Sequence, residues 1–235
     1  MAKFGISETL QRETRKDDIT QIGISTWTLA KEALKANDIE QAEKLMDQGI
    51  FELRQTHDVV VRTTAEWLDY IAKNLGEEHV VKVWGCSLPG PDGMKKLAAA
   101  AAEERIYQFT EVFRGHSGGP ANLGDLTVVE EADRFVMTHN PCGSGGRVRR
   151  TGLYGVTKRA YPWSWGKAGV HYYCVHCCLF WEITATNVCG FPLRIHENVD
   201  RPQEPCVQYV YKRPELIPER YFTRLGLKRN PTQFK

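Results

Sequence analysis

The sequence predicts an α+β protein in which an N-terminal layer of helices packs on a mixed or antiparallel sheet, with a cysteine metal knuckle tying the strands together. Three observations carry this prediction. Apolar residues recur at spacings of three and four between residues 37 and 75, as in amphipathic helices. After residue 125 the share of β-branched and aromatic residues rises, as in strands. The same half of the chain contains a Cys-x-x-Cys motif, a spacing that lets one tight turn bind a metal ion.

The helical region begins after Asn37 and holds one long amphipathic helix or two in succession. Asp38 is suited to cap its N-terminus, and Gly76 is suited to end it. A second helix is expected from Met94 to Phe113, where Ala, Glu and Lys are frequent. A loop at 87–93 and a connector at 116–125 should flank this helix. The apolar positions of the first pattern are Ala42, Leu45, Met46, Ile50, Leu53, Val60, Val61, Trp67, Leu68, Ile71 and Leu75.

The β-rich portion follows residue 125. The stretch LTVVEEADRFVMTHN, residues 126–140, is expected to form two short strands around a polar turn. Prolines and charges in residues 212–235 indicate a short surface helix and a tail. Further strands are expected over Cys178–Thr184, Pro192–Glu197 and Val207–Tyr211.

These assignments divide the chain into three regions. Residues 1–36 form a polar arm and a lead-in helix, 37–120 a helical region, and 121–235 a β-rich metal-binding region. The last two are expected to form one compact unit. Residues 1–22 carry many charges and few large apolar groups, which predicts a mobile arm or a short polar helix.

The composition excludes several classes of partner. Lys and Arg number 31 against 29 Asp and Glu, so no broad basic surface is expected for nucleic acid. No apolar run approaches the roughly 20 residues that cross a bilayer, and the polar N-terminus lacks the apolar core of a secretion signal. We therefore expect a cytoplasmic protein. In that reducing compartment, seven cysteines indicate metal binding or thiol chemistry rather than disulfides.

The cysteines of the C-terminal half are the strongest candidates for chemistry. The segment YCVHCC, residues 173–178, places two thiols three positions apart. In PCGSGGR, residues 141–147, glycines allow the backbone to fold closely around a ligand atom, and a further Pro-Cys pair begins a later strand. The four predicted metal ligands are Cys142, Cys174, Cys177 and Cys206.

Four sulfurs match a structural zinc site, whereas three protein ligands plus water match a catalytic one. The expected cofactor is therefore zinc, with iron as the alternative, since an iron–sulfur cluster also takes four cysteines. His176 could replace one cysteine. Two alternatives involve no metal: Cys142 and Cys206 are buried small apolar residues, or the Cys-x-x-Cys pair is a redox couple.

Other residues are candidates for catalysis or binding. His57 lies on the apolar stripe of the long helix, and His171 lies close to the cysteine motif, so either can move a proton near neutral pH. Arg147 follows the glycine run and offers a guanidinium for a substrate carboxylate or phosphate. Trp163 suits the wall of an aromatic pocket. For each of these residues, a purely structural role is the alternative.

Three segments carry a resemblance: PCGSGGR at 141–147, AYPWSWGKAGVHYYCVHC at 160–177 and EPCVQYVYKRPELIPERYF at 204–222. They resemble a group of bacterial and archaeal proteins that form a domain of unknown function, and ELRQTHD at 52–58 resembles the N-terminal helix of that group. The layout of residues 190–212 is more distantly similar to the L-2-amino-thiazoline-4-carboxylate hydrolase family and to vinyl-reductase-like ligand-binding domains. This resemblance implies a small-molecule site and assigns no catalytic residue.

Two functions follow from these observations. The first is a metal-dependent hydrolase or lyase acting on a small organic acid or heterocycle, in which the metal polarises a carbonyl or activates water. The second is a small-molecule-binding or sensory domain whose zinc is purely structural. A thiol redox protein is a third, weaker option. The expected partner is a small molecule rather than nucleic acid or a membrane, and assembly into a homo-oligomer stays open.

Overall fold

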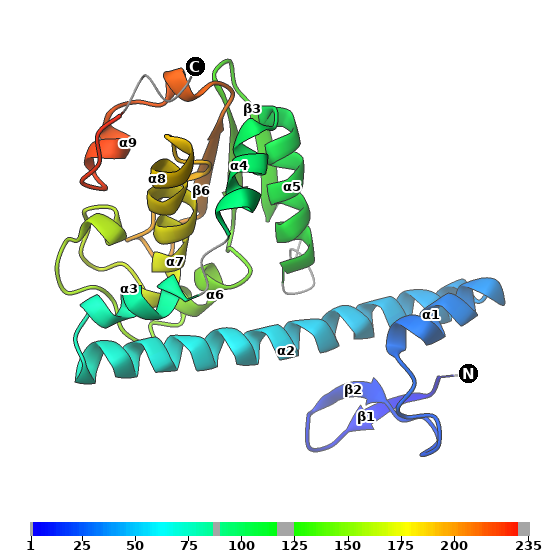
Figure 1. Cartoon of the computed structure of the whole chain (residues 1–235). Coiled ribbons are helices and arrows are strands. Elements are labelled where there is room, and N and C mark those ends of the chain that lie inside the picture. Colours follow the sequence, from blue (N-terminus) through cyan, green and yellow to red (C-terminus); the bar gives the residue numbers. More distant parts are fainter. Residues whose placement is uncertain (1, 87–89, 117–124, 230–235) are drawn as a thin grey trace. The chain divides into compact units, whose positions relative to one another are not determined.

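The chain is described by a computed structural model that covers residues 2–86, 90–116 and 125–229 (Figure 1). It separates into two compact units, Met1–His57 and Asp58–Lys235, which we call the N-terminal and C-terminal units. The division falls inside one long helix, α2, Ile39–Asn74. The fold is α+β, as the sequence predicts, because helices pack on antiparallel sheets.

The N-terminal unit begins with a β-hairpin, so the expected mobile arm or polar helix is wrong. Strands β1, Phe4–Ser7, and β2, Arg12–Arg15, pair antiparallel. The buried carboxylate of Asp17 closes the base of the hairpin, accepting from the backbone N–H of Lys3 at 2.7 Å and from Nε of Arg15 at 2.9 Å. The high charge content did not predict these strands, because their polar groups form hydrogen bonds with one another in the hairpin.

Helices α1, Thr26–Lys35, and α2 complete this unit. The predicted cap is confirmed, because Oδ1 of Asp38 accepts from the backbone N–H of Gln41 at 3.2 Å. Beyond the division, α2 continues unbroken to Asn74, and Gly76 follows with φ of +107°, a conformation that side chains disfavour. The periodic pattern thus forms one helix.

The next helices are α3, Glu78–Gly85, α4, Pro91–Ala99, and α5, Ala102–Gly115. The helix expected from Met94 to Phe113 is therefore two helices, because Ala100 and Ala101 are extended. Alanine favours helices, so composition does not mark this break. Pro91 starts α4, which shortens the expected loop at 87–93. Residues 87–89 of that loop and 117–124 of the expected connector lie outside the described residues.

The second sheet contains β3, Leu126–Glu130, β4, Arg134–His139, β5, Ile195–Glu197, and β6, Cys206–Tyr211. Its order is β3-β4-β6-β5, and all neighbours are antiparallel. The strand pair expected at 126–140 is confirmed. The register aligns His139 with Cys206, and both Met137 and His196 with Gln208, so polar groups gather on one sheet face.

The segment Cys178–Thr184 is a π-helix, η4, so the strand expected there is wrong. It continues α7, Val175–Cys177, and leads into α8, Ala185–Cys189. The backbone carbonyl of Trp181 accepts from the N–H of Leu193 at 2.9 Å, so the chain that returns from α8 satisfies this group of the π-helix. A short apolar run does not by itself distinguish a buried helix from a strand.

Shorter helical segments connect and follow these elements: α6 Gly145–Arg150, η2 Pro162–Ser164, η3 Tyr172–Cys174, η5 Pro214–Leu216 and α9 Arg220–Thr223. The main core joins the sheet to α4, α5, α8 and α9, and includes Met94, Ile106, Phe109, Met137, Leu193, Val210 and Phe222. None of the described helices has the length and apolar character of a membrane span.

Candidate functional site

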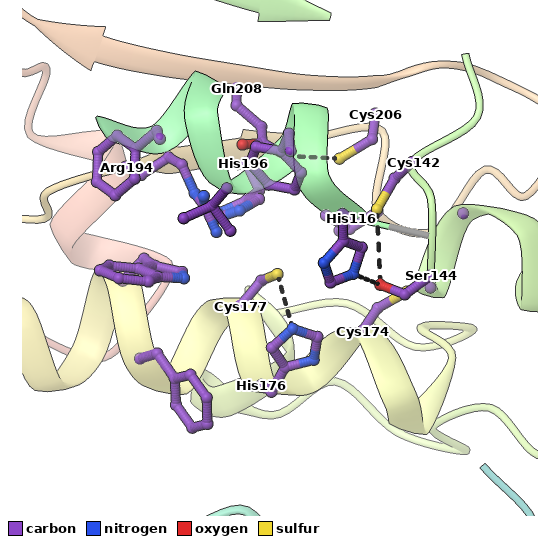
Figure 2. Close-up of a pocket in the computed structure, with 18 of the residues that line it drawn as sticks. His116, Cys142, Ser144, Cys174, His176, Cys177, Arg194, His196, Cys206 and Gln208 are labelled. Atoms are coloured by element: carbon purple, nitrogen blue, oxygen red, sulfur yellow. Dashed lines mark hydrogen bonds between the residues drawn. The ribbon is translucent and has the colours of Figure 1, made fainter. Parts of the chain in front are cut away.

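A cavity of about 330 Å³ lies in the C-terminal unit. Its walls come from α5, the turn before α6, the continuous helix formed by α7 and η4, and strands β5 and β6 (Figure 2). Eight aromatic or aliphatic side chains line the cavity together with nine cysteine, histidine and arginine side chains. Small-molecule sites likewise combine apolar walls with polar groups that orient a ligand, and the share of polar groups is high here.

The structure brings all four predicted cysteines to this cavity: Cys142, Cys174, Cys177 and Cys206. The cysteines come from different parts of the chain (Figure 2). Cys142 lies in the turn before α6, Cys174 and Cys177 lie on the helix of η3 and α7, and Cys206 is the first residue of β6. Pairing of β4 with β6 explains part of this arrangement. Cys206 lies opposite His139, and the chain reaches Cys142 three residues later.

Two glycines give the sulfur-bearing segments room to approach. A Cβ atom on Gly145 would lie 2.8 Å from Sγ of Cys174, and a Cβ atom on Gly146 would lie 2.8 Å from Cβ of Cys142. Both distances are too short for real contacts, so glycine is required at these positions. The PCGSGGR motif therefore brings backbone close to Cys142 and Cys174. Its predicted contact with a ligand atom stays a prediction.

Among the described residues, no group of three or more His, Cys, Asp or Glu side chains has the arrangement of a metal site. The four cysteines that line the cavity are free thiols. As a donor set they still suit zinc or iron, because thiolates prefer these metals to magnesium or calcium. The metal knuckle stays a prediction.

The thiols differ in their electrostatic surroundings. Burial raises the pKa of Cys174 and raises that of Cys206 to about 12. Burial also acts to raise the pKa of Cys177, but the imidazoles of His176 and His196 outweigh it and lower this pKa well below its ordinary value. The Nε2 atom of His176 lies 3.4 Å from Sγ of Cys177. Negative charge in the cavity therefore concentrates on Cys177.

A buried carboxylate fixes one histidine of the cavity. Both the backbone N–H and the Nδ1 atom of His196 lie 2.9 Å from Oε1 of Glu182. The same carboxylate accepts from Nε1 of Trp165 and from Nη2 of Arg224, each at 2.6 Å. Burial acts to raise the pKa of Glu182, but Arg224 and His196 outweigh it and lower the pKa. The carboxylate thus stays ionised and holds the ring of His196 in place.

Arg194 is a buried cation of the cavity wall, with 3% of its surface exposed. Its guanidinium carbon lies 4.8 Å from the ring centres of Phe109, Phe113 and Trp181. Within the described part of the chain, no Asp or Glu forms an ion pair with Arg194. Burial lowers its pKa, and the thiol of Cys177 is the nearby group that offsets this effect most.

The other predicted site residues lie elsewhere. His171 uses both ring nitrogens, since Nδ1 accepts from the N–H of Tyr173 at 3.1 Å and Nε2 lies 3.3 Å from the carbonyl of Leu153. It lines a separate cavity of about 130 Å³. Trp163 stacks on Tyr161, with 4.3 Å between ring centres.

Arg147 forms an ion pair with Asp58 and is not among the residues that line the cavity. His57 is half-buried on α2 and belongs to the N-terminal unit. The proton-transfer role of His57 stays a prediction.

Sequence reasoning missed Glu182, Arg194 and His196. One signal was present in the run CLFWEIT, residues 178–184, where a single carboxylate stands among apolar residues. A buried charge needs a partner, so that glutamate marks a tertiary contact. A second signal was the spacing of two between Arg194 and His196, which places both on one face of a strand.

Comparisons with protein-family models, with curated proteins and with solved structures found no match.

Proposed function

We propose that the C-terminal unit is a metal-dependent hydrolase or lyase acting on a small organic acid or heterocycle. The observation that carries this proposal is the position of Arg194. Its buried guanidinium lines the same cavity as the four thiols, and no Asp or Glu in the described residues forms an ion pair with it. Arginine binds carboxylates with two parallel hydrogen bonds, which gives both affinity and orientation.

The cavity suits such a ligand in size and lining. Its volume of about 330 Å³ is near the lower end for small-molecule sites. The aromatic rings around Arg194 keep water from its charge, which strengthens the attraction to a bound carboxylate. A compact ring or chain with one acidic group fits these walls.

The four thiols of the cavity support the metal dependence of the proposed enzyme. Zinc, with iron as the alternative, is the metal that Cys142, Cys174, Cys177 and Cys206 would hold. When bound, such a metal supplies a Lewis acid that polarises a carbonyl or lowers the pKa of water. Because the thiols face the cavity, a metal held there adjoins the space for a ligand, which favours a catalytic role over a purely structural one.

The number of thiols supports a second candidate function. Four cysteines are enough to close a tetrahedral zinc shell and leave no position for substrate. The unit would then be a small-molecule-binding or sensory domain that uses Arg194 to hold an acid without transforming it. Both functions place the protein in the cytoplasm, where reducing conditions keep thiols free. In both, the partner is a small molecule, and formation of a homo-oligomer stays open.

Binding and turnover of small acids test these proposals. The full chain, loaded with zinc, is screened by NMR against small aromatic and heterocyclic carboxylic acids and their cyclic amides. Arg194→Met should weaken binding of the acids more than about tenfold, because a buried charge partner is lost. Arg147→Met is the matched control and should bind as the wild type does, since Arg147 pairs with Asp58.

Conversion of a bound acid or amide to product, abolished by removing zinc, is the result expected of the hydrolase or lyase. Tight binding without turnover favours the binding domain. Unchanged binding by Arg194→Met, with weakened binding by Arg147→Met, would contradict the assignment of the acid-binding arginine.

A further inference from the structure

One nitrogen atom in the cavity wall has no role in the site described so far. His196 lies on β5 and is 1% exposed, and its Nε2 atom is buried. Within the described residues, that atom has no hydrogen-bond partner. A buried polar atom without a partner costs free energy, so its position calls for an explanation.

The surroundings of His196 determine what this nitrogen can do. Nδ1 lies 2.9 Å from Oε1 of Glu182, and the backbone N–H of His196 donates to the same oxygen at 2.9 Å. A carboxylate only accepts, so Nδ1 carries a proton. The Nε2 atom is therefore the ring nitrogen that is left to bind a metal ion.

We propose that His196 is a nitrogen ligand of the metal ion in this cavity and that Glu182 is the residue that positions it. Histidines that bind metals typically donate their other ring N–H to a carboxylate, which fixes the ring and raises its basicity. Glu182 is itself fixed by Trp165 and Arg224, each at 2.6 Å. This inference rests on the metal site of the proposed function and adds a ligand to it.

His176 also lines the cavity but differs from His196 in its contacts. The Nδ1 atom of His176 lies 2.5 Å from the carbonyl oxygen of Tyr173, and its Nε2 lies 3.4 Å from Sγ of Cys177. Both of its nitrogens are therefore engaged. His196 and Cys177 line the same cavity (Figure 2).

The added nitrogen changes the expected composition of the site. Four thiols and one imidazole exceed the four positions of tetrahedral zinc, so at least one of the four cysteines is not a ligand. A mixed sulfur–nitrogen shell resembles catalytic zinc sites more than a shell of four cysteines does.

Cobalt titration of the full chain tests this inference. Metal-free protein is titrated with Co²⁺, and the absorption bands report the number of thiolates and the geometry. His196→Ala should weaken Co²⁺ binding at least about tenfold and shift the ligand-field bands. The control variant is His79→Ala, because His79 lies on α3, pairs with Glu78 and is not among the residues that line the cavity; it should leave both nearly unchanged. His196→Cys should restore binding and increase the thiolate charge-transfer intensity, which a loss of folding cannot do.

Three results would overturn the inference in distinguishable ways. Wild-type protein that binds no cobalt contradicts the metal site of the proposed function as well. Cobalt binding with an unchanged spectrum and affinity in His196→Ala contradicts the nitrogen ligand alone. A cobalt spectrum of the wild type that indicates four thiolate ligands also excludes His196 as a ligand. The metal site would then consist of the four cysteines.

Discussion

Replacement of Glu182 by alanine should strongly destabilise the C-terminal unit. The side chain is 0% exposed, and its two oxygens accept from the indole of Trp165, the backbone and ring N–H groups of His196, and the guanidinium of Arg224. Glu182→Ala leaves three N–H groups and one cation without this acceptor. Such donors lie far apart in sequence, so no local shift supplies a replacement for all of them.

The expected loss in the free energy of unfolding follows from these contacts. Each of the three N–H groups loses at least about 1 kcal/mol if it stays buried without an acceptor. Arg224 keeps partial compensation, since its Nη1 atom lies 3.7 Å from Oε2 of Glu197 and its Nη2 donates to the carbonyl of His196 at 3.0 Å. We therefore expect a loss of about 3–5 kcal/mol in the free energy of unfolding, the range for breaking a buried ion pair.

Urea unfolding of the full chain, followed by circular dichroism in the presence of a chelator, measures this loss without a contribution from metal. Arg201→Ala is the control, because it removes an exposed ion pair with Glu204 whose side chains are 60% and 47% exposed. That control should change stability by less than about 1 kcal/mol. A loss below about 1 kcal/mol for Glu182→Ala would refute the account of this buried network.

Two further predictions concern His171 and the glycine motif. Burial lowers the pKa of His171 from 6.5 to about 4. As the pH falls from about 6.5 to about 4, the unfolded chain takes up a proton on His171 and the folded chain does not. The free energy of unfolding should therefore fall by up to about 3 kcal/mol over this pH range. His171→Asn keeps an acceptor for the N–H of Tyr173 and should flatten this pH dependence of the unfolding free energy; an unchanged profile would contradict the assigned burial effect. Gly145→Ala should weaken zinc binding, measured by competition with a chromophoric chelator, because its Cβ would lie 2.8 Å from Sγ of Cys174. Gly93→Ala, with open space around the added Cβ, is the control, and equal zinc affinity in both variants would argue against the close approach.

Features with a local physical cause were predictable from the sequence. The apolar period gave the extent of α2, and Asp38 caps it as expected. The alternation in residues 126–140 indicated the pair β3 and β4. The cysteine motifs pointed to one place in the fold, since all four cysteines line the same cavity. In each case the signal depends on neighbouring residues or on the known preferences of sulfur.

Other features depend on contacts between distant segments. Glu182, His196 and Arg224 meet only after the chain has returned from η4 through β5 to α9, so no spacing in the sequence relates them. Similarly, the aromatic rings that surround the Arg194 guanidinium come from two separate helices, α5 and η4. The π-helix was missed because its apolar run shows neither a clear helical nor a clear strand period.

The metal content of the purified protein shows whether the cysteines of the cavity hold a metal ion. Full-length chain without an affinity tag, freshly purified without chelators, is analysed for zinc and iron by mass spectrometry of the elements. We expect about one metal ion per chain, mostly zinc, and a loss of that metal in Cys177→Ser, whose thiol lines the same cavity as His196. Protein that is folded and free of both metals, and that takes up neither when they are added, would contradict the account.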